Sequence, residues 1–236
     1  MSVLANRSRA VKVIVWPAVA CSALCVVGCN SRQARVPAPG WDPPLIAARA
    51  LEQLDADSDI TIDPTEAEAV PGIAAAFVRL DADSDGRLSE SELQARFAFY
   101  EKLRTGLVAQ SFRILLNGRP VADAKVDFVP EEFQGGVTEV ASGLTDYSGF
   151  VVPQTVGQEK PAMQIGFYRV LLYPAAASAD KPLETRSPVG VEVSPVNESY
   201  EPGGPTLRFE TSSYKSPDRR AAFHNSVDFT IFNKGV

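Results

Sequence analysis

Cysteine and histidine are scarce in this sequence of 236 residues. The three cysteines, Cys21, Cys25 and Cys29, all lie within the first 29 residues, and the single histidine is His224. Because no cysteine follows Cys29, the rest of the chain has neither a disulfide framework nor a cysteine-based metal site. A histidine-dependent catalytic triad or zinc site would depend on His224 alone. Spacing identifies no triad partners for it, so we do not expect an enzyme.

Positive charge is also in short supply. Lysine and arginine number 23 against 29 acidic residues, and the net charge of −6 argues against nucleic acid as a partner. The acidic residues are concentrated, since residues 41–104 contain 14 of them and 6 basic residues. The first forty residues, in contrast, carry five basic groups and no acidic one. The negative charge therefore belongs mainly to one segment.

No apolar run reaches the roughly 20 residues of a membrane span. The longest, Val13 to Val27, follows three basic residues and is typical of an export signal. Its end, Val26-Val27-Gly28-Cys29, resembles the lipobox of bacterial lipoproteins. The resemblance implies a signal peptide over residues 1–29, cleavage before Cys29 and lipid on that cysteine. It also implies anchoring to a bacterial membrane, on the periplasmic or cell-surface side.

Two alternatives stay open for this segment. Cys21 and Cys25 are weaker lipid acceptors, because one follows a very short apolar run and the other follows the bulky Leu24. An uncleaved anchor or an ordinary signal peptide would carry no lipid at all. Residues 30–40 are polar and rich in proline and glycine, which predicts a flexible tether.

Residues 81–92 read DADSDGRLSESE, with oxygen donors at places one, three, five, nine and twelve. These donors are Asp81, Asp83, Asp85, Ser89 and Glu92, and the carbonyl of Arg87 at the seventh place adds another. The sixth residue, Gly86, suits the positive φ of a sharp bend. The spacing resembles an EF-hand calcium loop, and calcium takes six to eight oxygens at about 2.3–2.6 Å. Ser89 and Glu92 also fit a capping box, which requires no metal.

Residues 55–66, DADSDITIDPTE, repeat this pattern. The corresponding donors are Asp55, Asp57, Asp59, Asp63 and Glu66, with the carbonyl of Thr61 at the seventh place. Ile60 takes the sixth place, where a β-branched residue at positive φ costs about 1–3 kcal/mol. We therefore expect this loop to distort or to bind calcium more weakly, the alternative being a purely structural partner. The eighth-place residues Ile62 and Leu88 are expected to face each other across a short two-stranded bridge.

Helical periodicity surrounds both loops. A helix is expected to begin at Pro43-Pro44 with an apolar face, and the segment between the loops is expected to break near Pro71-Gly72. The apolar positions predicted to form core faces are Leu45, Ala48, Leu51, Leu54, Ile73, Phe77, Leu80, Leu93, Phe97, Tyr100 and Leu103. Methionine is absent from residues 41–104, which argues against the Met-rich groove of a calcium sensor and favours structural calcium.

From about residue 107 the periodicity becomes that of short strands. The strand segments are Ser111–Leu116, Ala124–Val129, Val137–Leu144, Phe167–Tyr173, Val189–Val193, Thr206–Glu210 and Val227–Phe232. Asn117-Gly118 predicts a hairpin turn after the first of them. The pattern predicts an antiparallel β-sandwich over residues 107–236, preceded by a helical calcium-binding pair over residues 41–106. The expected fold class is therefore a multidomain α+β protein.

Turn motifs in this half resemble those of a carboxypeptidase regulatory-like domain. They are Gly118–Ala124, the Thr-Asp-x-x-Gly-Phe turn at Thr145–Phe150, Tyr168–Val170 and Tyr214–Pro217. The resemblance implies a transthyretin-like sandwich and carries no activity. Of the acidic residues here, Asp146 is expected to cap a turn, and Glu131 and Glu132 to lie in a solvated loop.

These patterns together predict a calcium-binding, membrane-anchored lipoprotein whose sandwich is a structural or binding module. One alternative is an adhesion or glycan-binding module with structural calcium, in which Tyr147, Phe150 and Tyr173 would form one exposed patch. A further alternative is the accessory domain of a hydrolase. A protein or glycan ligand of the sandwich is possible in either case.

Overall fold

A computed structural model describes residues 36–174, 181–196 and 204–212. In these ranges, the structure contains no helix that is both long and apolar enough to cross a membrane. Several predictions lie outside the described residues. They concern the signal segment with Cys29, most of the tether, the strand at Val227–Phe232, the Tyr214–Pro217 motif and His224.

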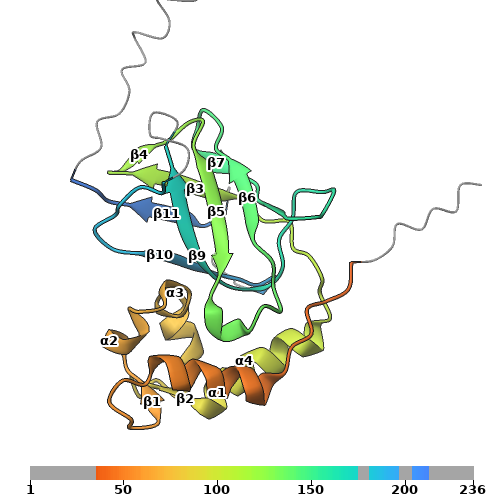
Figure 1. The fold of residues 1–236 in the computed structure, drawn as a ribbon, viewed down its shortest axis with the longest axis vertical. Helices are drawn as coiled ribbons and strands as arrows, with labels where there is room; N and C mark the ends of the chain where they lie inside the picture. Colours follow the sequence, from red (N-terminus) through yellow and green to blue (C-terminus); the bar gives the residue numbers. More distant parts are fainter. Residues whose placement is uncertain (1–35, 175–180, 197–203, 213–236) are drawn as a thin grey trace, which may run out of the picture. The chain divides into compact units, whose positions relative to one another are not determined.

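Four α-helices occupy the first part of the described chain, in the order shown in Figure 1. They are α1 (Pro43–Leu54), α2 (Pro64–Ala67), α3 (Pro71–Leu80) and α4 (Glu90–Leu103). Three of them begin with a proline, whose missing N–H is not needed at the first helical position. The predicted start at Pro43 and the break at Pro71-Gly72 are confirmed.

The predicted apolar face of α1 is half wrong. Leu51 and Leu54 are buried, but Leu45 is 45% exposed and Ala48 is also exposed. The buried positions are Ile46, Ala47, Ala50, Leu51 and Leu54. A uniform spacing of three residues drifts away from the helical period of 3.6, so it cannot stay on one face. The predicted face of α4 is confirmed for Leu93, Phe97 and Tyr100, which are fully buried, while Leu103 is partly buried.

The strands of the described residues form three sheets. The strands are β1 (Thr61–Ile62), β2 (Leu88–Ser89), β3 (Phe112–Leu116), β4 (Arg119–Pro120), β5 (Lys125–Pro130), β6 (Ala141–Leu144), β7 (Phe150–Val151), β8 (Gln154–Thr155), β9 (Gly166–Tyr173), β10 (Val189–Val193) and β11 (Thr206–Phe209). A 3₁₀ turn, η1 (Glu132–Gln134), follows β5. β1 pairs with β2, the large sheet has the order β10-β9-β5-β6-β8, and the small sheet has the order β11-β3-β4 with β7 also paired to β3.

Six of the seven predicted strand segments contain a strand in the structure. The turn between β3 and β4 has positive φ at Asn117 (48°) and Gly118 (75°), as the hairpin prediction requires. One pairing departs from an antiparallel arrangement, because β11 runs parallel to β3. β11 follows β10, which belongs to the other sheet, so no tight hairpin imposes an antiparallel partner on it.

The large and small sheets enclose one apolar core. Phe112 and Ile114 of β3, Phe209 of β11, and Phe128 and Val170 of the large sheet all belong to it and are almost fully buried. Phe112 and Phe128 lie with ring centroids 4.8 Å apart. The fold is thus α+β with largely antiparallel sheets, an arrangement compatible with a β-sandwich.

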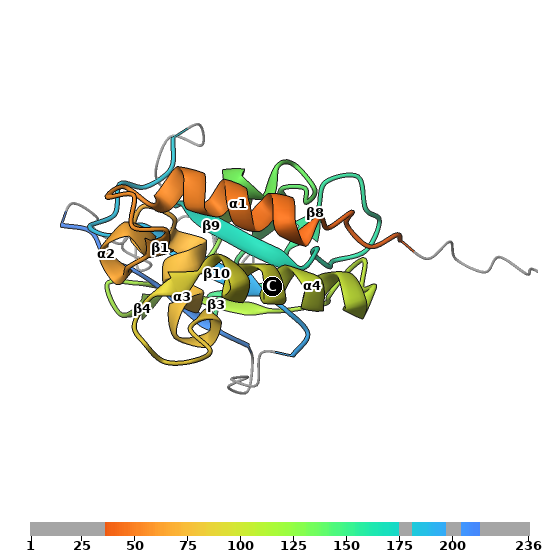
Figure 2. The ribbon, with the colours of Figure 1, turned by 90° about the horizontal axis from the view of Figure 1, so that it is seen from below.

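A second core joins the helices to the large sheet. Its centre is a group of aromatic rings around Phe97 of α4. The ring centroid of Phe97 lies 5.8 Å from those of Trp41 and Phe167, and 6.0 Å from that of Phe133 of η1. Each such pair contributes about 0.5–1.5 kcal/mol beyond the area that it buries. α1 lies alongside α4 (Figure 2), and α3 packs against β10. The helices and the large sheet therefore both contribute buried side chains to this core.

Two glycines allow α3 to approach the sheet backbone to backbone. A Cβ on Gly190 of β10 would lie 2.0 Å from the carbonyl carbon of Pro71. A Cβ on Gly72 would lie 3.0 Å from the backbone nitrogen of Tyr168. The first turn of α3 consequently lies directly against the main chain of β9 and β10.

Candidate metal centre

The two acidic loops lie in equivalent places between helices. Residues 55–66 connect α1 to α2, and residues 81–92 connect α3 to α4. The strands β1 and β2 join the loops, with Ile62 directly opposite Leu88 and both side chains fully buried. The prediction that these eighth-place residues face each other is confirmed.

Each loop gathers its first three aspartates. One carboxylate oxygen from each of Asp55, Asp57 and Asp59 lies within 4.8 Å of the others, and the same holds for a second trio. The second trio is Asp81, Asp83 and Asp85. Carboxylates this close repel one another, and a shared cation would remove that repulsion. Hard divalent cations are bound by such oxygen clusters.

The same backbone hydrogen bonds hold both trios. In the first loop, Asp55 accepts the amide of Asp59 at 3.1 Å and that of Ile60 at 2.9 Å. In the second, Asp81 accepts the amide of Asp85 at 3.1 Å and that of Gly86 at 3.0 Å. The third- and fifth-place aspartates repeat this correspondence. The two loops are therefore copies of one local structure.

The twelfth-place glutamates close their loops. Glu66 accepts the amide of Ala56 at 2.7 Å and that of Asp63 at 2.9 Å. Glu92 accepts the corresponding amides of Ala82 and Ser89, both at 2.8 Å. Both loops also end in a capping box, with Asp63 and Ser89 as the N-caps. The predicted capping box at Ser89 and Glu92 is thus present, and the aspartates of the same loop are clustered as well.

Ile60 does not distort the first loop. Its φ is 70°, close to the 86° of Gly86 at the same place in the second loop. Its amide keeps the bond to Asp55, and its side chain is 70% exposed. Of the two expected consequences of a β-branched residue here, distortion is wrong: the hydrogen bonds hold the backbone in the left-handed region.

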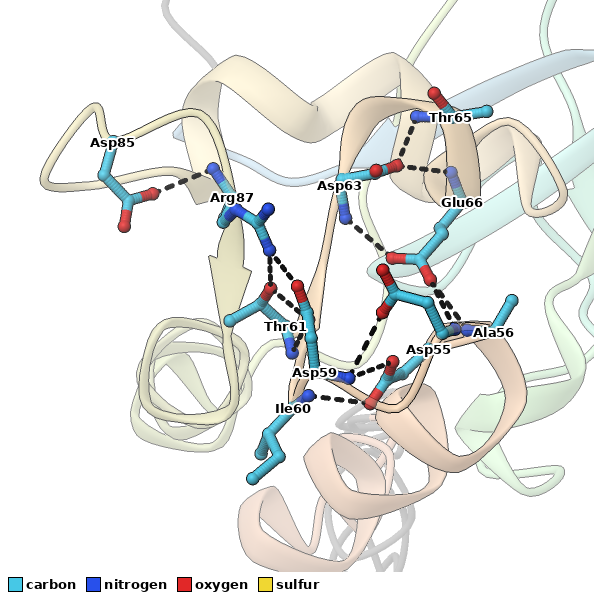
Figure 3. Close-up of polar contacts among 11 residues, drawn as sticks. Asp55, Ala56, Asp59, Ile60, Thr61, Asp63, Thr65, Glu66, Asp85 and Arg87 are labelled. Atoms are coloured by element: carbon cyan, nitrogen blue, oxygen red, sulfur yellow. Dashed lines mark hydrogen bonds and ion pairs between the residues drawn. The ribbon is translucent and has the colours of Figure 1, made fainter.

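An ion pair between the loops was not anticipated from the sequence. Figure 3 shows the guanidinium of Arg87, from the second loop, reaching the carboxylate of Asp59 in the first. Arg87 also donates to the hydroxyl of Thr61 at 2.9 Å. The other oxygen of Asp59 accepts both the amide and the hydroxyl of Thr61, at 2.9 and 2.6 Å. Both oxygens of Asp59 are thus engaged, one of them by a positive charge.

These contacts move neighbouring pKa values in opposite directions. The hydrogen bond from the Thr61 hydroxyl, followed by that from Arg87, lowers the pKa of Asp59. Desolvation, followed by the negative charge of Asp59, raises the pKa of Asp57. In the second loop, hydrogen bonds from Ser89, Ala82 and Asp83 outweigh partial desolvation and lower the pKa of Glu92. A lowered pKa keeps Asp59 and Glu92 charged.

Three acidic residues that the sequence singled out lie outside the loops. Asp146 caps its turn as predicted, accepting the amides of Ser148 and Phe150 at 2.8 and 2.9 Å. The prediction for Glu131 is wrong, because this residue is 5% exposed and accepts the amide of Gly72 at 2.9 Å. The packing of α3 onto the sheet buries it, whereas Glu132 is exposed as predicted.

The predicted aromatic patch is divided between the sheets. Phe150 belongs to the small sheet and points away from the core that its neighbour Val151 enters. Tyr173 belongs to the large sheet and points away from the same core, which Leu172 enters. These two side chains therefore face opposite sides of the paired sheets. Tyr147, 81% exposed, lies in the turn before Phe150.

A buried carboxylate that lies beside the second loop was not identified from the sequence. Glu192 of β10 has a fully buried side chain. It forms ion pairs with Arg79 of α3 and Arg96 of α4, and it accepts a hydrogen bond from the hydroxyl of Tyr100 of α4. An acidic residue within an apolar strand pattern was the one indication in the sequence.

No known protein family, curated protein or solved structure matches this chain.

Proposed function

We propose that the two loops are a pair of EF-hand calcium sites in a lipoprotein that is exported and anchored to a bacterial membrane. The observation that carries the proposal is the duplication of one geometry. Two twelve-residue loops, joined at Ile62 and Leu88, each bring three aspartate oxygens within 4.8 Å of one another. A solvated acidic turn gives no reason for this clustering to occur twice with the same hydrogen bonds.

The donor set suits calcium better than magnesium. In the second loop, Asp81, Asp83 and Asp85 would supply three oxygens, the Arg87 carbonyl a fourth and Glu92 two more. Ser89 would contribute directly or through a water molecule. Calcium accepts six to eight oxygens in flexible geometry, whereas magnesium requires a near-ideal octahedron and retains several waters. Asp55, Asp57, Asp59, the Thr61 carbonyl, Asp63 and Glu66 would form the first site.

Calcium would act on the stability of the fold. A ligand bound by the folded chain alone stabilises it by about 2.7 kcal/mol at a hundred times its Kd. Outside the cytoplasm a Kd of about 10⁻⁴–10⁻³ M is sufficient, as for other extracellular calcium modules. Because the helices share a buried core with the large sheet, this stabilisation would extend to the sandwich. The sandwich would then be a calcium-stabilised structural or binding module, with a transthyretin-like fold.

Calorimetric titration of residues 36–236 with calcium tests the metal assignment. We expect two binding events, of which Asp81→Ala or Glu92→Gln removes one and Glu66→Gln removes the other. Glu132→Gln, an exposed carboxylate outside the loops, is the matched control and should retain both. Absence of binding at millimolar calcium would refute the proposal.

Lipid attachment is tested separately in cells. Radiolabelled palmitate should be incorporated into the full chain and should be lost in Cys29→Ser. Cys21→Ser and Cys25→Ser are the matched controls and should stay labelled. Labelling that survives Cys29→Ser would contradict the assignment of the lipid to this residue.

A further inference from the structure

Both helices of the second loop are tied to one carboxylate of the large sheet. Arg79 lies two residues before the loop, and its Nε and Nη2 each lie 3.0 Å from Oε2 of Glu192. Arg96 lies four residues after the loop and donates from Nε to Oε1 of Glu192 at 2.7 Å. Tyr100, one turn further along α4, also donates to Oε1. A single side chain thus connects the two ends of the loop.

Burial makes this connection hard to rearrange. The Glu192 side chain is fully buried, while those of Arg79 and Arg96 are 42% and 20% exposed. A buried carboxylate that loses one charged partner is left poorly compensated in a low-dielectric surrounding, which is strongly unfavourable. Moving α3 or α4 relative to β10 would require such a loss. The spacing of the two helices is consequently fixed by the sheet.

The connection reaches the loop itself. A hollow of about 300 Å³ beside the loop is lined by Arg79, Arg96, Ala82 and Glu92, among others. Ala82 is the second residue of the loop and donates its amide to Glu92, the twelfth. The groups that hold the helices and the groups that close the loop therefore border the same space.

The first loop lacks an equivalent arrangement among the residues that the structure describes. None of the ion pairs found there joins α1 or α2 to the sheet. The two loops are alike in local geometry but differ in how their helices are fixed. This difference gives an internal comparison for an experiment.

We propose that Glu192 is a positioning residue for the second loop, holding α3 and α4 so that Asp81 and Glu92 stand ready for one cation. This inference rests on the proposed calcium function. Holding the helices in the binding arrangement before the cation arrives reduces the ordering cost of binding. Loss of the tie should weaken calcium binding at the second loop and leave the first loop nearly unchanged.

The test uses the full chain in detergent, read by hydrogen exchange with mass spectrometry across a calcium titration. Peptides covering residues 55–66 and 81–92 report the two loops separately. In Glu192→Gln we expect the calcium concentration that half-protects residues 81–92 to rise about tenfold. The value for residues 55–66 should change less than about twofold. Arg79→Gln, a change at a half-exposed side chain, should act in the same direction and serves if Glu192→Gln does not fold.

Asp127→Asn is the matched control. Asp127 is a buried carboxylate of the same sheet, paired with Lys125 at 2.8 Å, and it lies on strand β5. The Asp127→Asn variant should have a lower melting temperature, without a selective change in the calcium concentration that half-protects either loop. Equal weakening of both loops in Glu192→Gln, or selective weakening of the second loop in Asp127→Asn, would overturn the proposal.

The calcium-free state separates this inference from the calcium assignment. If the wild-type chain binds no calcium, the proposed function fails, but the positioning role can still be read. Exchange of residues 81–92 without calcium should then be faster in Glu192→Gln than in the wild type, with residues 55–66 unchanged. Identical exchange in both proteins would refute the positioning role on its own.

Discussion

Ile60 and Gly86 occupy the same place in two equivalent loops and share nearly the same backbone conformation, with φ of 70° and 86°. Glycine adopts this conformation without strain, whereas a β-branched residue does not. The hydrogen bond from each amide to the first aspartate of its loop is 2.9 Å for Ile60 and 3.0 Å for Gly86. The fold therefore imposes on Ile60 a conformation that its side chain disfavours.

Replacing Ile60 with glycine should stabilise the protein. The strain removed is about 1–3 kcal/mol, and glycine costs about 0.5–1 kcal/mol in the entropy of the unfolded chain. We expect the free energy of unfolding to rise by about 1 kcal/mol, measured by urea denaturation without calcium. The reciprocal Gly86→Ile should lower it. A destabilised Ile60→Gly would show that the exposed isoleucine contributes a contact that outweighs its strain.

Removing the side chain of Arg87 should strengthen cation binding at the first loop. Its guanidinium now neutralises part of the Asp59 charge and holds one of the carboxylate oxygens. Two charges about 4 Å apart at a solvated surface interact enough to change binding roughly fivefold. In Arg87→Ala we expect calcium to bind the first loop about that much more tightly, measured by calorimetry at low salt.

The gain from Arg87→Ala should shrink as salt is added, because both side chains are solvent-accessible. Arg119→Ala changes an exposed arginine outside the loops and is the control. Weaker binding at the first loop would mean that Arg87 organises Asp59 for the metal and does not compete with it.

Adding one methyl group at Gly190 should disrupt the packing of α3 on the sheet. The new Cβ would lie 2.0 Å from the carbonyl carbon of Pro71, and backbone cannot move aside as a side chain can. Overpacking of this kind costs about 1–3 kcal/mol or more. Gly190→Ala should therefore lower the melting temperature, whereas Gly40→Ala, with no atom within 4 Å of its new Cβ, should not. Equal melting temperatures would show that α3 is not seated on β10.

The ionisation of Glu131 should lower the free energy of unfolding as the pH rises. Burial raises its pKa above the ordinary value of 4.5, although the hydrogen bond from Gly72 and the charge of Arg169 oppose the rise. A carboxyl with a raised folded pKa stabilises the fold below the unfolded pKa. That contribution is lost as the pH increases from about 4.5 through the folded value.

Glu131→Gln keeps an oxygen for the Gly72 amide and carries no charge. The free energy of unfolding of the variant, relative to wild type, should therefore increase with pH across this window, measured by urea denaturation. Glu132→Gln removes only the smallest of the contributions to the raised pKa of Glu131, so its difference from wild type should increase much less with pH. A difference for Glu131→Gln that does not change with pH would contradict a raised pKa of Glu131 in the folded protein.

Much of the candidate site was predictable because its determinants are local. The donors of a loop lie within twelve residues, and the turn residue and the caps follow from short-range geometry. The bridge between Ile62 and Leu88 joins the two loops and was predicted from their resemblance to paired EF-hand loops. Six strand segments and the hairpin at Asn117-Gly118 were likewise readable from alternation and turn chemistry. The face of α1 was partly misjudged because spacing alone does not fix where a helix meets its neighbours.

By itself, the sequence determined the two acidic loops, their spacing and the change from helical to strand periodicity near residue 107. The tertiary structure alone decided which charges meet. Arg79 and Glu192 are 113 residues apart, and Gly72 and Glu131 are 59 apart. Such pairs depend on where α3 packs against β9 and β10. The backbone contacts at Gly72 and Gly190 fix the position of α3 on the sheet. No periodicity or motif encodes it, because it results from packing between segments distant in the chain.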